Sequence, residues 1–445
     1  MVAFLLLRGH TAGATVGWRD GRAVAVEQFI AAARALQRRL PVGAHCVNLC
    51  QDRLNFALGF AAALIGGSIS VLPPSRTPGA LRDIEARFGR CCVLADSAGD
   101  GADVAAADVS FDDAADADTS MPAIDGAQTA FVAFTAGSTG TPSAHAKSWQ
   151  ALVQGAAALR ERVPMTPGSA VVGTVPPQHM WGIEATVMLP LQSGGALHSG
   201  SPLLPADIAA CLTAVDAPRW LVTTPLHIRS CVLGLVALPP LAGVATATAP
   251  LDATVAASFE AQSRATVIEI YGSTETGAIA TRRTAAGEAF RALSGLRLRS
   301  LAGKAVVDGG HVGLQVALND RIVVRGDREF TLAGRSADIV KIGGKRTSLA
   351  ALNFELNRIP GVLDGAYCHR DDAGPVGRLM AFVVAPGLAR GAIIGALRER
   401  VDPVFLPRPL VIVDALPRTA VGKLPEQAMA QLRTAAIRQA AEDDR

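Results

Sequence analysis

The hydrophobic pattern of the first third of the chain predicts alternating helices and strands. Residues 24–40 carry apolar side chains at helical spacing, and the CVNLC that follows predicts a short buried strand. Residues 55–74 form an uncharged run that approaches the length of a membrane span. A double glycine and a closing double proline divide this run into a buried helix, a turn and a strand. The pattern is typical of an α/β fold, and we expect no membrane span.

Two glycine-bearing turns each follow a compact apolar strand. TAFVAF, residues 129–134, leads into FTAGSTGTPSAHAK and then a helical pattern, and ATVIEI, residues 265–270, leads into YGSTETG. Small residues leave backbone N–H groups unhindered, and hydroxyls add donors, which suits the oxygens of an oligophosphate. No Gly-Lys pair is followed by Ser or Thr, so the common P-loop is absent. The first loop is therefore a phosphate-binding candidate, although an ordinary structural turn explains GSTG alone equally well.

After Gly310 the pattern changes to shorter elements. RIVVRGDREFTLAGR predicts a hairpin that turns at Gly326-Asp327, and a helix, further strands and a closing helix follow. The segment 335–344 is the best candidate for a domain joint. The sequence thus predicts a large N-terminal α/β domain of layered sheets and helices, residues 1–334, and a small C-terminal α+β domain, residues 335–445.

Composition narrows the class of protein. The 445 residues exceed one ordinary core, and a net charge of +3 without a basic run argues against nucleic acid as a partner. The seven cysteines lack a CxxC pair or zinc spacing, so we expect reduced, mostly buried thiols. The amino end is too short and uncharged for a signal peptide, so we expect a cytoplasmic protein. The Asp-rich segment 95–126 lacks a fixed ligand spacing and predicts a solvated connection rather than a metal site.

Four separated motifs occur in this order along the chain: FTAGSTGTP (134–142), YGSTETG (271–277), LAGRSADIVKIGGKR (332–346) and LPRTAVGKL (416–424). Together they resemble the adenylate-forming ligases, the superfamily of acyl-CoA synthetases, aryl-acid ligases and nonribosomal peptide adenylation domains. The resemblance runs from about residue 24 to about residue 430. It implies the fold of these ligases, with a mobile C-terminal domain, and a two-step reaction. A carboxylic acid and ATP with Mg²⁺ give an acyl-adenylate and pyrophosphate, and a pantetheine thiol of an acyl carrier protein or of CoA then takes the acyl group.

The same resemblance assigns a nucleotide site. In the second turn, Tyr271 and Gly272 match residues that flank the adenine, Thr274 the residue that meets the α-phosphate, and Glu275 the carboxylate that helps to hold magnesium, a cation that prefers oxygen ligands. Positions of the first loop match the residues that hold the β- and γ-phosphates, and two later positions match ribose or phosphate contacts. The loop positions are Thr135, Gly137, Ser138, Thr139 and Gly140, and the later ones are Asp320 and Arg335.

Lys423 matches the catalytic lysine that reaches the active site from the small domain, where it acts with Thr274 and Glu275. Joining a carboxylate to an α-phosphate brings two anions together, and a mobile ammonium offsets their repulsion. The resemblance also implies an acid pocket and, after the small domain swings about a joint near 336–338, a thiol tunnel. The pocket candidates are His179, Trp181, Gly182, Ala247 and Thr248, and the tunnel candidates are Gly343 and Gly344. A satisfied core histidine remains the alternative for His179.

The sequence departs from the family in two places. Ser143 stands where the family usually has a lysine after the loop's proline, and the nearest lysine is Lys147. We hypothesise that Lys147 substitutes for it. At the joint, Ala337 replaces the usual Asp or Lys, with Asp338 next to it, so neither residue alone is assigned as the pivot.

The loop followed by HAKSW is similar to the ligases of bacterial aryl-polyene and xanthomonadin pigment pathways, which favours a small aromatic acid. Trp181 suits a short or medium-chain fatty acid equally well, so a fatty acyl-CoA synthetase stays open. A non-catalytic nucleotide-binding scaffold is the rival of another class, against which the retention of Glu275 and Lys423 argues. A Walker-type or ATP-grasp ATPase is disfavoured by the missing GK[ST] loop.

Overall fold

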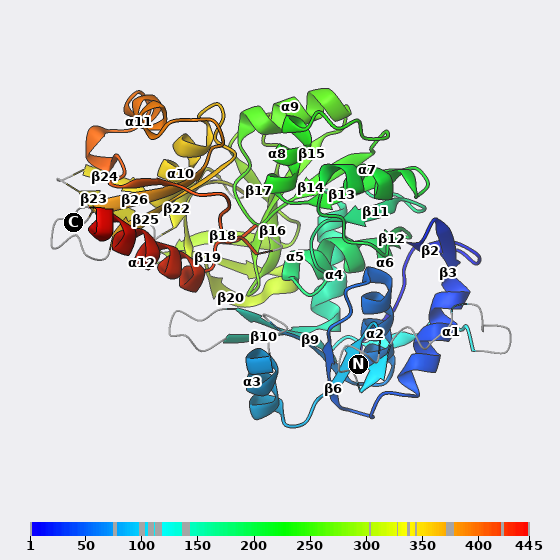
Figure 1. Ribbon diagram of the computed structural model, residues 1–445. Helices are drawn as coiled ribbons and strands as arrows, with labels where there is room; N and C mark the ends of the chain where they lie inside the picture. The colour runs from blue at the N-terminus through cyan, green and yellow to red at the C-terminus, as the bar shows by residue number, and fades with distance from the viewer. Residues whose placement is uncertain are drawn as a thin grey trace. The chain divides into compact units, whose positions relative to one another are not determined.

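The computed structural model describes residues 2–73, 78–97, 103–105, 111, 118–135, 143–301, 304–326, 328–335, 339–342, 345–370, 378–419 and 422–443. The chain divides into two compact units (Figure 1). The first comprises Met1–Leu298, Val307–Val316 and Asp327–Glu329, and the second comprises Arg299–Val306, Ala317–Gly326 and Phe330–Arg445. The expected pivot at 336–338 lies outside the described residues.

A largely parallel sheet forms one layer of the first unit. All neighbouring strands run parallel except β10, which is antiparallel to β9 and lies at one edge of the sheet. The strand order is β10 (Ser143–Ser148), β9 (Thr129–Thr135), β5 (Ile69–Leu72), β4 (His45–Asn48), β6 (Cys92–Ala95) and β7 (Val104–Ala105). A separate antiparallel pair joins β1 (Ala3–Leu5) to β8 (Ala123–Asp125).

A larger mixed sheet forms the other layer, with a parallel centre. Within the first unit its strand order is β17 (Phe290–Ala292), β16 (Gly277–Arg282), β15 (Val267–Ser273), β14 (Gly243–Thr246), β13 (Arg219–Thr223), β11 (Ala170–Gly173), β12 (Ala196–His198), β2 (Thr15–Arg19) and β3 (Arg22–Ala25). Ligands of open parallel sheets bind beyond the carboxyl ends of the strands. The chain leaves β15 at such an end and returns antiparallel along β16.

Helices cover these sheets and supply most of the core. One group packs on β11 and β13–β15: α7 (Pro205–Thr213), α8 (Pro225–Leu233) and α9 (Ala253–Ser263). The other helices of this unit are α1 (Val26–Gln37), α2 (Arg53–Ile65), α3 (Pro78–Phe88), α4 (Trp149–Arg160), α5 (Met180–Ile183), the π-helix η4 (Glu184–Met188) and α6 (Leu189–Leu191). The first turn of α4 is fixed by Ser148, whose hydroxyl accepts the N–H of Ala151 at 3.2 Å.

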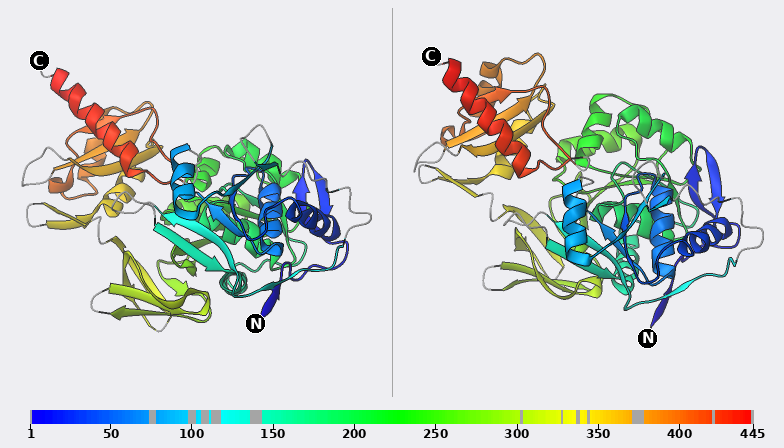
Figure 2. Two further views of the ribbon diagram at one scale, coloured as in Figure 1. Left: turned by 90° about the horizontal axis from the view of Figure 1, so that it is seen from below. Right: turned by 60° about the horizontal axis from the view of Figure 1, so that its bottom comes forward.

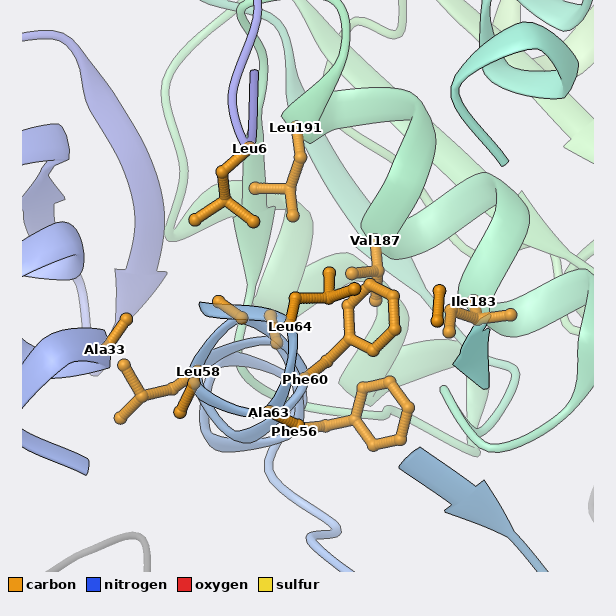
Figure 3. Close-up of a cluster of buried hydrophobic side chains, with 14 of the residues drawn as sticks. Leu6, Ala33, Phe56, Leu58, Phe60, Ala63, Leu64, Ile183, Val187 and Leu191 are labelled. Carbon is orange, nitrogen blue, oxygen red and sulfur yellow. The ribbon is translucent and has the colours of Figure 1, made fainter. Parts of the chain in front are cut away.

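The central core is built around α2, which is buried along almost its whole length. Figure 3 shows Phe60 of α2 pointing toward Val187 of η4, while Leu58 faces Ala33 of α1. Burying a side chain the size of Leu or Phe stabilises the fold by about 1.5–3 kcal/mol. The π-helical turn is therefore held by the core on the side that faces α2.

The boundary between the units passes through a small sheet of β18 (Leu296–Leu301), β19 (Lys304–Gly309) and β20 (Gly313–Ala317), with the 3₁₀ turn η5 (Gly310–Val312). In the second unit, β25 pairs antiparallel with β26 and β26 parallel with β27. Helix α12 packs on this sheet through Met429 (Figure 2). The elements of this part are β21 (Asp320–Val324), β22 (Glu329–Arg335), β23 (Ile339–Ile342), β24 (Lys345–Ser348), α10 (Leu349–Asn357), β25 (Asp364–Arg370), β26 (Arg378–Val384), α11 (Arg390–Arg398), η7 (Pro403–Phe405), β27 (Leu410–Ile412) and α12 (Glu426–Asp443).

Most elements expected from the pattern are present, and two expectations need correction. Strand β10 was not predicted between the first loop and α4, because alternation in SAHAKS is easily taken for loop sequence. The segment 95–126 contains β7 and β8, so it is more than a solvated connection where it is described. The described part of the run, residues 55–73, does form a helix, a turn and a strand. No described helix combines the length and apolar character that a bilayer crossing requires.

Candidate active site

The YGSTETG turn joins β15 to β16 at the edge of the parallel part of the larger sheet. Two side chains hold the turn closed. The backbone N–H of Ser273 donates to the hydroxyl of Thr276 at 3.2 Å, and the backbone N–H of Thr276 donates to the hydroxyl of Ser273 at 3.3 Å. A Cβ on Gly272 would lie 2.2 Å from the carbonyl oxygen of Gly277, so only glycine fits there. The ring of Tyr271 lies 5.7 Å from that of Phe290, centroid to centroid. The turn thus presents the backbone around Thr274 and Glu275 in a fixed shape.

Strand β10 reaches this turn from the other sheet of the same unit. His145 and Lys147 are two residues apart and share one face of the strand. The Nζ of Lys147 donates to the backbone oxygen of Glu275 at 2.5 Å, and the Nε2 of His145 lies 3.8 Å from the Oε1 of Glu275. The structure therefore brings Lys147 to the predicted site of the α-phosphate and magnesium. Its role as the substitute lysine stays a prediction.

Glu184 completes this cluster and was missed by the sequence analysis. Its Oε1 and Oε2 accept the backbone N–H of Ala278 at 3.1 and 3.2 Å, just after the turn. A Cβ on Gly277, which has a φ of +73°, would lie 2.3 Å from Oε1. One feature of the sequence could have indicated Glu184: it is the sole Asp, Glu, Lys or Arg between residues 163 and 206.

Burial and neighbouring charges shift the pKa values of the groups in this cluster. Its deep position raises the pKa of Glu184 to about 7, against the opposing effects of the Ala278 N–H and Lys147. Burial also lowers the pKa of Lys147, although Glu184 and Glu275 both oppose this. Burial alone would raise the pKa of Glu275, but the hydroxyl of Ser273, its own backbone N–H and the charges of His145 and Lys147 outweigh it and lower the pKa. Glu275 is therefore held ionised beside a cation.

One carboxylate at this turn suits magnesium that arrives with a nucleotide. Mg²⁺ is commonly held by one or two carboxylates together with substrate phosphates rather than by a cage of protein ligands. Among the described residues there is no group of three or more metal-ligating side chains. Glu275, with 30% of its side chain exposed, could hold such an ion with its phosphate partners.

Two of the predicted acid-pocket positions meet at one carbonyl. The indole Nε1 of Trp181 and the backbone N–H of Ala247 both donate to the oxygen of Thr223, each at 3.4 Å, at the carboxyl end of β13. Gly182 allows a close approach, since a Cβ there would lie 1.9 Å from the oxygen of Pro176. Thr248, which follows Ala247, has a φ of +85°, a strained value for a β-branched residue.

His179 has a structural task in this region. Its Nδ1 accepts the N–H of Trp181 at 3.2 Å and so caps α5. This supports the alternative of a satisfied histidine, and the pocket role of His179 stays a prediction.

A second buried histidine near Trp181 was also missed. The Nδ1 of His227 lies 2.8 Å from the hydroxyl of Thr224 and 3.3 Å from that of Thr174, which in turn lies 2.9 Å from the hydroxyl of Thr223. Burial lowers the pKa of His227 to about 4, so the ring is neutral at pH 7. The first turn of α8 thereby adds polar groups to the carboxyl ends of β11 and β13.

The second unit carries the remaining described candidates. Asp320, the expected ribose contact, and Arg335, the expected ribose or phosphate contact, are backbone partners on β21 and β22. Lys423 is exposed at the end of a turn in which its carbonyl accepts the N–H of Thr419 at 2.8 Å. Arg418 anchors this turn, with its Nε and Nη2 on the carboxylate of Asp364 at 2.5 and 2.7 Å.

Several candidates lie outside what the structure describes. Thr135 ends β9, but its side chain, like that of Arg335, is not described. The expected loop and tunnel glycines and hydroxyls fall on undescribed residues: Gly137, Ser138, Thr139, Gly140, Gly343 and Gly344.

Comparison with known proteins defines the family. A family model described as AMP-binding enzyme matches residues 29–327. A 4-coumarate–CoA ligase of Rhodobacter capsulatus is 33% identical over 296 residues, which cover 65% of this chain and 73% of that protein. The chain therefore belongs to the AMP-binding enzyme family.

Solved structures at low identity share the fold. The anthranilate CoA ligase AuaEII in complex with anthranoyl-AMP matches with a TM-score of 0.79 at 16% identity, covering 97% of this chain and 95% of that one. ATP-bound MatB from Rhodopseudomonas palustris matches with a TM-score of 0.78 at 18% identity, covering 95% and 96%. The predicted fold of an adenylate-forming ligase is confirmed. The family and these relatives also confirm the predicted enzyme class, an AMP-forming acid–thiol ligase.

Proposed function

We propose that this enzyme activates a small aromatic carboxylic acid as its acyl-adenylate, with ATP and Mg²⁺, and transfers the acyl group to a pantetheine thiol. The observation that carries the nucleotide part is the convergence of Lys147 and His145 on the turn that holds Glu275. A cation and a carboxylate at one turn are what a magnesium triphosphate requires.

The roles of the turn residues are those that the family resemblance implies, and the role of Lys147 is our hypothesis. Thr274 contacts the α-phosphate, Glu275 holds magnesium, Lys147 contacts the triphosphate, and Tyr271 and Gly272 flank the adenine. The undescribed loop supplies further phosphate contacts through its N–H groups and hydroxyls. Magnesium, when bound, neutralises phosphate charge and orients the departing pyrophosphate.

The roles of the second unit rest on the family resemblance. Lys423 offsets the charge that develops between carboxylate and α-phosphate, Asp320 contacts the ribose, and Arg335 contacts the ribose or a phosphate. The unit then swings about residues 336–338 so that Gly343 and Gly344 reach the thiol.

The acid pocket is assigned to the region of Trp181, Ala247 and Thr248. Support for an aromatic acid comes from the relatives, which are described as ligases of 4-coumarate and of anthranilate, whereas the buried indole suits an apolar acid of either kind. The neutral His227 with its threonine neighbours favours an acid that carries a hydrogen-bonding group over a plain fatty acid. CoA is the acceptor of those relatives, whereas the similarity to pigment-pathway ligases favours a carrier protein.

ATP–pyrophosphate exchange with a panel of benzoic, hydroxybenzoic, aminobenzoic, cinnamic and short fatty acids tests the proposal. Exchange that depends on an aromatic acid is expected. Exchange with fatty acids alone would select the fatty acyl-CoA synthetase, and no exchange with any acid would select the scaffold. Thioester formation with CoA and with a holo-carrier protein, measured on the best acid, then distinguishes the acceptors.

A further inference from the structure

Glu184 is a charged residue that the proposed reaction does not use. It begins the π-helical turn η4, whose other residues are buried. π-Helical turns are rare and occur frequently at functional sites, because the extra residue redirects side chains. The π-helical turn is fixed by Thr186. Its hydroxyl donates to the backbone oxygen of Gly182 at 2.6 Å and accepts from Nη1 of the buried Arg53 at 2.6 Å. Glu184 therefore projects from a backbone that buried contacts hold in place.

Its carboxylate holds the strand that leaves the nucleotide turn. Both oxygens accept the N–H of Ala278, and the carboxylate can approach this closely only because Gly277 has no side chain. Lys147 holds the same segment at Glu275, through the backbone oxygen of that residue. The backbone from Glu275 to Ala278 is therefore bonded at its two ends by an acidic and a basic side chain from different elements.

These two charges also attract one another. An ammonium at the end of a partly buried strand loses hydration, and a nearby carboxylate compensates for that loss. Glu275 contributes attraction as well, but in the proposed function it must serve magnesium. Glu184, which accepts the backbone N–H of Ala278, remains available as a counter-charge once the pH exceeds its pKa of about 7.

We propose that Glu184 is a positioning residue of the nucleotide site, which fixes the end of the 271–277 turn and keeps the ammonium of Lys147 directed at that turn, where the triphosphate binds. This inference rests on the proposed function, and specifically on the phosphate role of Lys147. A carboxylate that merely lay near the triphosphate would repel it. The two roles predict opposite effects on ATP affinity when the charge is removed.

The test is a double-mutant cycle of Glu184→Gln and Lys147→Met. Glutamine keeps an oxygen that can accept the N–H of Ala278 but removes the charge that Glu184 carries above its pKa of about 7, so all measurements are made at pH 8. Binding of a non-hydrolysable magnesium-ATP analogue is measured by calorimetry on the full chain, and the KM for ATP, the KM for the acid and kcat are measured by pyrophosphate exchange. Glu260→Gln is the matched control, since Glu260 lies on α9 and is ion-paired with Arg283, which follows β16, and neither residue belongs to the 271–277 turn.

We expect Glu184→Gln to weaken binding of the analogue about 3- to 10-fold, with the KM for the acid unchanged, and to have no further effect when Lys147 is already Met. Tighter or unchanged binding in Glu184→Gln would overturn the inference, as would additive effects of the two substitutions or a raised KM for the acid alone. If the wild-type enzyme does not bind the analogue, the proposed function fails instead. Unchanged binding in Glu260→Gln, and a cooperative unfolding transition of Glu184→Gln well above the assay temperature, exclude a general loss of structure.

Discussion

Glu184 also predicts how stability depends on pH. Its folded-state pKa is raised from 4.5 to about 7, so the folded protein holds a proton that the unfolded chain has released. Such a group stabilises the fold below its unfolded pKa, and this contribution is lost as pH rises through the folded pKa. The affected window is therefore about pH 4.5 to 7.

The magnitude follows from the size of the shift. A rise of about 2.5 pKa units corresponds to roughly 3 kcal/mol at 1.36 kcal/mol per unit. The side chain is partly exposed, so solvent screening reduces this to about 1–2 kcal/mol. Glu184→Gln removes the titration, and its stability relative to wild type should rise by that amount between pH 5 and pH 8. For a unit of this size the difference corresponds to a gain of about 2–6 °C in Tm.

Thermal and denaturant unfolding of both proteins at pH 5, 6, 7 and 8 measures this difference. Glu260→Gln is again the control, because its ion pair with Arg283 lowers the pKa of Glu260 against the opposing effect of burial. That group contributes stability above its unfolded pKa, so its removal should cost a nearly constant amount over the same range. A stability difference between wild type and Glu184→Gln that does not change from pH 5 to pH 8 would refute the assignment of a raised pKa.

Three further substitutions test the proposed roles. Lys423→Ala should lower adenylate formation about 10²- to 10³-fold while sparing thioester formation from a supplied acyl-adenylate, and equal loss of both steps would contradict two separate poses. Lys147→Ala should raise the KM for ATP about tenfold, or by about 1.4 kcal/mol, and an unchanged KM would end its role as the substitute lysine. Arg418→Gln breaks the ion pair with Asp364 that anchors the Lys423 turn, so it should slow adenylate formation but not thioester formation. Arg433→Gln, which breaks an ion pair within α12, is the control: if it slows adenylate formation equally, the effect of Arg418→Gln is a general destabilisation of the second unit.

Local sequence was sufficient for the elements that carry the nucleotide turn. The apolar run before YGSTETG predicts β15, and the small residues of the turn predict a tight reversal, which the exclusion of a Cβ at Gly272 explains. Strand β15 runs on to Ser273, beyond its expected end, because pairing with β16 continues through Tyr271 and Gly272. Tertiary pairing of this kind is not encoded in the hydrophobic period of one segment.

The partners of the turn required the folded chain. Lys147 and Glu275 are 128 residues apart, and Glu184 and Ala278 are 94 apart. Spacing along the sequence says nothing about such contacts, since they depend on how the two sheets pack over α2 and η4. Alternation within SAHAKS does place His145 and Lys147 on one face, so their common direction was available once β10 was known to be a strand.

The position of Lys147 gives a physical reason for Glu184. A lysine at position 143, the exposed first residue of β10, would keep its ammonium in water until the nucleotide arrives, whereas Lys147, further along the strand, is fixed in a partly buried place throughout. A fixed ammonium reaches the phosphates with less ordering cost, but it loses hydration that must be compensated by a carboxylate. The transfer of the cation from position 143 to position 147 and the acid on η4 are therefore expected to depend on each other. A relative that has a lysine at the position of Ser143 should tolerate an uncharged residue at the position of Glu184, and introducing that lysine as Ser143→Lys should reduce the ATP-binding defect of Glu184→Gln.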